Sequence, residues 1–188
     1  MCTNRGKIEI LKRAVEKMKT LPINASDEEI KTLIIEWNEL LAQEKYEEAI
    51  DFILYENTKV VDGEIWIWTP EKLEAAVYTY GMPWYSKEEY EAEYGEGAAD
   101  LKVASLLHSP NSKELLDKIS FEINYYTVSA ERAELWGISN TDYENIMGDV
   151  LYDGVPLNDW NSDLTAIFYL KKIDENHMTL CFQDLHVM

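Results

Sequence analysis

The sequence predicts an α+β protein in which N-terminal helices pack on a C-terminal, mostly antiparallel, curved sheet. Apolar residues recur every three or four positions over most of residues 1–118, and they alternate from residue 119 onward. Helices that precede the strands, rather than alternating with them, are typical of the α+β class. The chain has 188 residues, so we expect a single domain, 1–188, with a mainly helical region over residues 1–118 and a mainly strand region over residues 119–188.

Three helices are expected at the start of the chain. Residues 6–19 place their apolar side chains on one face. Ser26, with Glu29 three residues later, forms a capping box that opens the second helix. The third begins near Tyr46 and turns its apolar residues inward.

Shorter elements follow in the middle of the chain. Residues 64–68 alternate as a short strand. Thr69 and Pro70 are the N-cap and first residue of a helix. Ser86 and Glu89 form a second capping box, which opens a short, very acidic helix.

The remainder combines short helices with longer strands. Residues 99–108 fit either a helix or a strand, and a helix is favoured. Ser112 is expected to cap a further helical turn. Residues 129–136 and 141–147 predict short helices, the second closed by Gly148. Four segments are extended or alternate with period two and predict strands, namely residues 121–128, 149–157, 164–173 and 178–187.

Charge narrows the class of partner. Acidic residues outnumber basic ones 36 to 17, which gives a formal net charge of −19. The first 20 residues carry +4, so residues 21–188 carry −23, from 34 acidic and 11 basic residues. Such a field repels phosphate backbones and anionic lipids, so we expect neither nucleic-acid nor membrane binding. It favours a basic protein partner, or it serves solubility alone.

Several functional classes lack their sequence signatures. The two cysteines, Cys2 and Cys181, form no CxxC pair, so no disulfide framework is expected. The longest apolar run has five residues, against about 20 for a membrane span. No apolar signal region opens the chain, which favours a cytoplasmic location. Without a phosphate-binding loop, GxSxG or HExxH, and with three histidines, we expect no catalytic residues, metal site or cofactor.

An aromatic and acidic segment is the leading candidate binding surface. Trp and Tyr side chains anchor protein interfaces, and carboxylates steer basic partners onto them. The alternative is that the rings belong to the core and the glutamates to its solvated rim. The candidate partner-binding residues are Trp66, Trp68, Trp84, Tyr85, Glu88, Glu89, Tyr90, Glu91, Glu93 and Tyr94.

A second group of residues, of unassigned role, lies near the C-terminus. Residues 159–166 read Asp-Trp-Asn-Ser-Asp-Leu-Thr-Ala, and residues 183–188 read Gln-Asp-Leu-His-Val-Met. They resemble the end of a family of uncharacterised bacterial domains, which reads Trp-Ser-Asp-Leu-Thr-Ala, then a strand, then Asp-Ile-His-Val. Here Asn161 separates Trp160 from Ser162. The resemblance implies a link to immunity proteins and toxins, and it assigns no activity.

Strand alternation suggests how these residues meet. It places Asp184 and His186 on the same face as Phe182, with Asp163 on the neighbouring strand. Such a group suits metal binding or acid–base chemistry. The structural alternative is that Ser162 and Asp163 cap a turn, while His186 bonds a carboxylate at the sheet rim.

The order of elements also resembles NTF2-like domains, whose helices and curved sheet enclose a conical pocket. That resemblance implies a pocket lined by alternate strand residues such as Tyr125, Phe168 and Phe182. Two functions therefore stay open. One is a non-enzymatic acidic binding protein, such as an immunity or inhibitor protein that masks a basic toxin. The other is an NTF2-like pocket protein that binds or transforms a small molecule. A purely structural subunit is a third option.

Overall fold

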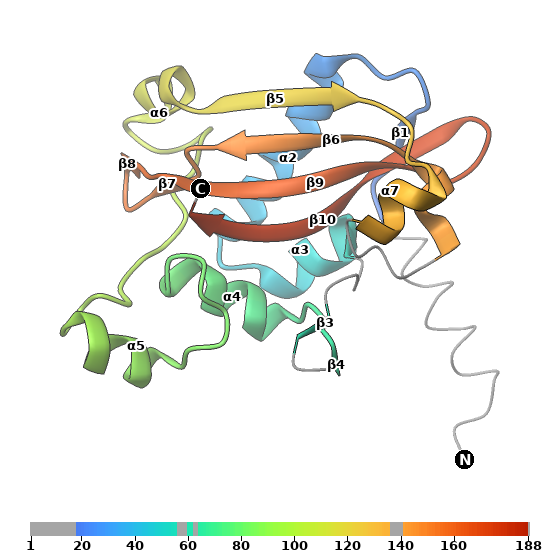
Figure 1. Cartoon of the computed structure of the whole chain (residues 1–188). Coiled ribbons are helices and arrows are strands. Elements are labelled where there is room, and N and C mark those ends of the chain that lie inside the picture. The colour runs from blue at the N-terminus through green and yellow to red at the C-terminus, as the bar shows by residue number, and fades with distance from the viewer. Residues whose placement is uncertain (1–17, 56–59, 62–63, 136–140, 188) are drawn as a thin grey trace.

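Helices cover one face of a strongly curved, mostly antiparallel sheet in the computed structural model of the chain (Figure 1). This arrangement confirms the predicted α+β class. The structure describes residues 18–55, 60–61, 64–135 and 141–187. The helix expected over residues 6–19, apart from its last two positions, lies outside the described residues, as does Cys2.

The main sheet has the strand order β1-β10-β9-β6-β5, and β2 pairs with β10 in parallel. Its strands are β1 (Leu21–Pro22), β2 (Leu54–Tyr55), β5 (Ser120–Tyr125), β6 (Ile146–Asp153), β9 (Leu164–Lys172) and β10 (His177–Val187). Two small two-stranded pairs are formed by β3 (Val60–Val61) with β4 (Glu64–Ile65), and by β7 (Pro156–Leu157) with β8 (Trp160–Asn161). The two long C-terminal strands therefore lie where the sequence predicts them.

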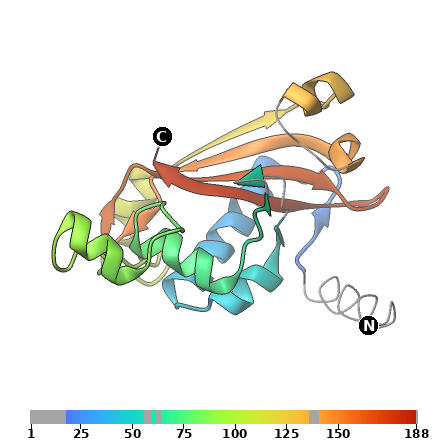
Figure 2. The same cartoon turned by 60° about the horizontal axis from the view of Figure 1, so that its bottom comes forward.

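Capping residues set the starts of several helices as predicted. Both halves of the capping box are present at Ser26 and Glu29, and again at Ser86 and Glu89. The helices are α2 (Asp27–Ala42), α3 (Tyr46–Phe52), α4 (Pro70–Tyr78), α5 (Lys87–Tyr94), α6 (Ser112–Lys118) and α7 (Ala130–Leu135), with a 3₁₀ turn, η1 (Thr141–Asn145). In Figure 2, α2, α3 and α4 lie on one side of the sheet and α7 on the other.

The main core lies between α2 and the sheet. Trp37 is fully buried there, and its ring centroid lies 5.2 Å from that of Phe168 and 5.4 Å from that of Phe182. Its indole N–H donates to the Tyr55 hydroxyl over 2.7 Å, so β2 is bonded to α2 as well as to β10. Aromatic burial of this kind is the main stabilising contribution expected for a sheet covered on one face by helices.

The helix favoured over residues 99–108 is wrong. Val103 forms a bridge with Leu157, and the Ala104 N–H donates to the Pro156 carbonyl over 2.8 Å. The Leu106 N–H donates to the carboxylate of Glu39 over 2.7 Å. Because tertiary partners bind these backbone groups, the segment stays extended and turned despite its helix-compatible composition.

Several element boundaries also differ from prediction. The strand expected over residues 64–68 ends at Ile65. The helix expected over 141–147 is a 3₁₀ turn that ends at Asn145, and β6 begins at Ile146. Gly148 does not stop a helix but lies inside β6, opposite Tyr125.

Close backbone approach explains the glycine in this strand. A methyl group at Gly148 would overlap the backbone carbonyl oxygen of Asn124 on β5. We expect Gly148→Ala to lower the free energy of unfolding by about 1–3 kcal/mol, because the backbones must separate to admit it. Urea denaturation followed by circular dichroism measures this. Glu122→Ala, at an exposed position of β5, is the control and should stay within about 0.5 kcal/mol. A Gly148→Ala variant as stable as the control would contradict the expectation.

Candidate functional site

The predicted partner-binding residues do not form one surface. Trp68 is 6% exposed: its indole N–H donates to the Gln183 carbonyl over 3.3 Å, and its ring lies 5.0 Å from that of Phe182. Tyr90 is also 6% exposed, and Trp66 is half-buried beside Trp68. Trp68 and Tyr90 are therefore buried residues rather than surface residues, as in the alternative that the rings belong to the core.

The remaining residues gather around α5, which projects beyond α4 (Figure 1). Trp84 is 67% exposed and Tyr94 is 50% exposed. The half-buried Tyr85 contacts Tyr94 with ring centroids 6.4 Å apart, and Tyr90 lies beneath at 4.5 Å from Tyr94. We call this surface the α5 patch and define it as Trp84, Tyr85, Glu88, Glu89, Glu91, Glu93 and Tyr94.

Local bonds fix two of the patch carboxylates. Glu89 accepts hydrogen bonds from Ser86, which hold the pKa of its carboxyl below the usual value. Glu93 accepts a bond from the Tyr85 hydroxyl over 2.7 Å, and this bond raises the pKa of Tyr85 to about 12. At neutral pH the Glu89 carboxyl is therefore ionised and the Tyr85 phenol is neutral.

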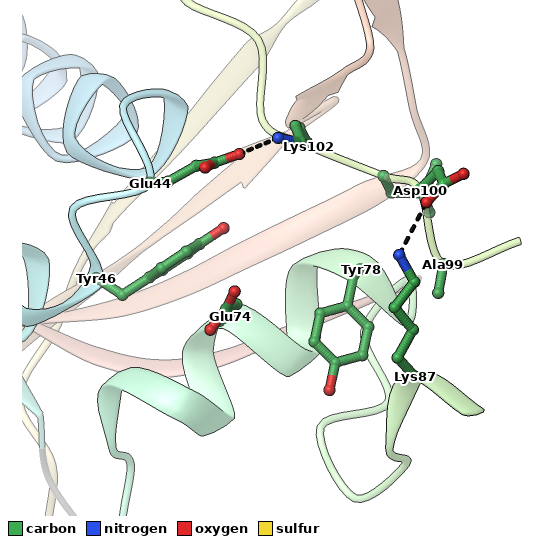
Figure 3. Close-up of a pocket in the computed structure, with 9 residues that line it drawn as sticks. Glu44, Tyr46, Glu74, Tyr78, Lys87, Ala99, Asp100 and Lys102 are labelled. Carbon is green, nitrogen blue, oxygen red and sulfur yellow. Dashed lines mark hydrogen bonds and ion pairs between the residues drawn. The ribbon is translucent and has the colours of Figure 1, made fainter. Parts of the chain in front are cut away.

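A cavity of about 350 Å³ lies next to the α5 patch (Figure 3). Lys87, the first residue of α5, is part of its wall. The cavity is lined by Glu44, Tyr46, Glu74, Tyr78, Lys87, Ala99, Asp100, Leu101 and Lys102. We call it the Glu74 pocket. It lies between the turn before α3, one face of α4, the start of α5 and residues 99–102.

Two ion pairs lie at the rim of the Glu74 pocket. Lys102 pairs with Glu44, and Lys87 pairs with Asp100 over 2.9 Å (Figure 3). Both lysine charges are thus matched by carboxylates within the wall. At exposed positions such pairs contribute little stability, but they set which charges remain for a ligand.

Glu74 carries the remaining charge. Its carboxylate forms no hydrogen bond or ion pair with any residue that the structure describes, and Figure 3 shows it between Tyr46 and Tyr78. Burial, and then the negative charge of Glu74, raises the pKa of Tyr46 and of Tyr78. Both phenols therefore stay neutral, and the pocket presents a carboxylate flanked by two aromatic rings.

The C-terminal motif forms a bonded turn. The Ser162 hydroxyl donates to the Val155 carbonyl over 2.6 Å and accepts the Leu164 N–H over 3.0 Å. The Tyr80 hydroxyl donates to the Asp163 carboxylate, and the Tyr80 ring stacks on Trp160. These contacts hold the start of β9 close to the C-terminal end of α4.

The sheet face predicted for Asp184 and His186, near the end of β10, is wrong. A β-bulge at Gln183 lets Phe182 pair with Phe168 while Asp184 pairs with Ile167. Asp184 and His186 therefore lie on the face opposite Phe182, because one extra residue inverts the alternation. His186 Nδ1 lies 3.3 Å from Asp184 Oδ2. Among the residues that the structure describes, no group of three or more His, Cys, Asp or Glu side chains is placed to hold a metal ion.

Two of the three rings assigned to an NTF2-like pocket lie in the packed interior. Phe168 and Phe182 are fully buried, and both contact Trp37 of α2. Tyr125 is exposed at the sheet edge, where its hydroxyl donates to Asp27 over 2.8 Å. Tyr125 therefore lies apart from the two phenylalanines, and Trp37 of α2 packs against the sheet face where the hypothesis places a ligand.

The fold and site define an α+β protein with an acidic, aromatic surface and an adjoining pocket. No protein-family model, curated protein or solved structure matches the chain in the three comparisons. Over residues 18–55, 60–61, 64–135 and 141–187, no helix has the length and apolar character needed to cross a bilayer.

Sequence reasoning missed most of the Glu74 pocket. Glu74 and Tyr78 lie four residues apart, so they share one face of α4, and this spacing is readable from the sequence. Tyr46, Asp100 and Lys102 come from distant segments, and no local pattern links them to α4. The pocket exists only because α3 and residues 99–102 pack against that helix.

Proposed function

We propose that this chain is a non-enzymatic acidic binding protein that masks a basic protein partner, in the manner of an immunity or inhibitor protein. The α5 patch is the docking surface. The observation that carries the proposal is the grouping of two exposed aromatic rings, Trp84 and Tyr94, among glutamates, because Trp and Tyr side chains grouped within a polar rim are typical of surfaces that bind a protein partner.

Charge around the patch supports a cationic partner. Residues 84–100 contain six carboxylates and one lysine, and that lysine is paired with Asp100. Exposed charges of this kind contribute mainly to the association rate and to partner selection rather than to affinity. The rings then supply the contact area, and the carboxylates orient the partner before contact.

Partner capture tests the proposal. Immobilised protein is incubated with extract of the native host at low and high ionic strength, where the Debye length is about 30 Å at 0.01 M and about 3 Å at 1 M. We expect proteins of high isoelectric point to be retained at low salt and released at high salt. The Trp84→Ala/Tyr94→Ala variant should retain at least about tenfold less, equal to about 1.4 kcal/mol of binding free energy.

Leu135→Ala on α7 is the matched control, since it removes an exposed apolar side chain from the other face of the sheet. It should retain as much as the unchanged protein. Both variants are first checked for unchanged circular dichroism. Retention of no basic protein, or equal retention by the double variant, would refute the proposed function.

A further inference from the structure

We infer that the Glu74 pocket binds one cationic side chain, the guanidinium of Arg or the ammonium of Lys, presented by the basic partner. This inference rests on the proposed function and assigns the partner a defined contact. The two surfaces are continuous, because Lys87 lines the pocket and begins α5, and because the Tyr78 hydroxyl lies 3.5 Å from the Tyr85 carbonyl oxygen. A partner seated on the α5 patch therefore has the pocket within reach of a long side chain.

Charge within the pocket selects a cation. Three carboxylates, those of Glu44, Glu74 and Asp100, face two ammonium groups, those of Lys87 and Lys102. The ammonium groups are already paired with Asp100 and Glu44, which leaves the charge of Glu74 unmatched among the described residues. An anionic ligand would have to break both pairs and lie against Glu74, whereas a cation needs to displace nothing.

The aromatic walls suit the same ligand. Tyr46 and Tyr78 flank Glu74, and a cation held by the carboxylate would lie against their rings (Figure 3). Cation–π contacts stabilise an ammonium or guanidinium by roughly 0.5–2 kcal/mol, depending on desolvation. The volume of about 350 Å³ is at the small end of ligand sites, which fits a side-chain head group better than a whole metabolite.

A small cationic probe tests the pocket without the partner. N-acetyl-arginine amide is titrated into the full chain, with N-acetyl-citrulline amide as the uncharged isostere, and the side-chain NMR signals of Tyr46 and Tyr78 are followed. We expect saturable binding of the arginine probe in the millimolar range and at least tenfold weaker binding of the citrulline probe. Equal binding of the two probes, or no saturation, would overturn the inference.

Two variants test the roles of the charges. Glu74→Gln keeps the size of the side chain, and it should weaken binding of the arginine probe about tenfold. Lys102→Gln frees Glu44 and removes a competing cation, so it should tighten binding severalfold. Glu131→Gln, at an exposed position of α7 outside the pocket, is the matched control and should bind like the unchanged protein. Unchanged probe affinity in Glu74→Gln would overturn the inference.

Partner capture separates this inference from the proposed function. With Glu74→Gln, we expect retention of the basic partner to fall by about tenfold, in parallel with the probe. If probe binding is lost but capture is unchanged, the inference fails and the proposed function stands. If the unchanged protein binds the probe but captures no basic protein, the proposed function fails, and the occupant is a free small cation rather than a partner side chain.

Discussion

Replacing Trp37 with alanine is expected to lower the free energy of unfolding by about 3–5 kcal/mol. The indole is fully buried between α2 and the sheet, where it contacts both Phe168 and Phe182. Its removal leaves a cavity that these rings cannot close without moving β9 and β10. The Tyr55 hydroxyl also loses the hydrogen bond that it accepts from the Trp37 indole N–H over 2.7 Å.

Urea denaturation, followed by circular dichroism and intrinsic fluorescence, measures this loss. Trp84→Ala is the matched control, because it removes the same side chain from an exposed position, and it should change stability by no more than about 0.5 kcal/mol. A loss below about 1 kcal/mol for Trp37→Ala would show that the α2–sheet interface is not the main core.

Replacing Glu39 with alanine is expected to lower the free energy of unfolding by about 2–4 kcal/mol. This is a large loss for a charged side chain on a helix. Its buried carboxylate accepts the Leu106 N–H over 2.7 Å, the Leu107 N–H over 3.2 Å and the Ser105 hydroxyl over 2.7 Å. Without it, the buried Leu106 N–H loses its acceptor, and each such orphaned donor costs about 1–3 kcal/mol.

Two further variants isolate this effect. Glu39→Gln keeps one carbonyl oxygen as an acceptor and should cost less than Glu39→Ala. Glu36→Ala removes an exposed glutamate from the same helix, paired with Lys19 only at 4.0 Å, and should be close to neutral. Equal losses for Glu36→Ala and Glu39→Ala in urea denaturation would show that the bonds to residues 105–107 do not hold this segment.

The sequence correctly predicted the helices and strands that depend on interactions between residues close together in the chain. The capping boxes at Ser26 and Ser86 open α2 and α5 because a side chain bonds a backbone group three residues away. Period-two alternation predicted β9 and most of β10 for the same reason: the pleat repeats every two residues whatever the strand pairs with.

Predictions failed where contacts with residues distant in the sequence determined the backbone conformation. Residues 99–108 have a helix-compatible composition, yet Glu39 and Pro156 bind their backbone groups. The bulge at Gln183 reverses the faces of Asp184 and His186, and it depends on how β10 pairs with β9. Neither partner is visible in the local pattern.

The candidate site was likewise predictable only in part. The sequence indicated an acidic and aromatic surface near α5, but it did not separate the buried Trp68 and Tyr90 from the exposed Trp84 and Tyr94. It gave no sign that Glu74 would lie between two tyrosines beside two matched ion pairs.

By itself, the sequence determined the α+β class, the net charge of −19 and the starts of the capped helices, because composition, periodicity and capping act over a few residues. Only the tertiary structure decided which rings are exposed and which charges are left unmatched. Exposure and charge pairing depend on segments far apart in the chain, and those segments meet only after α3, α4 and residues 99–102 have packed together.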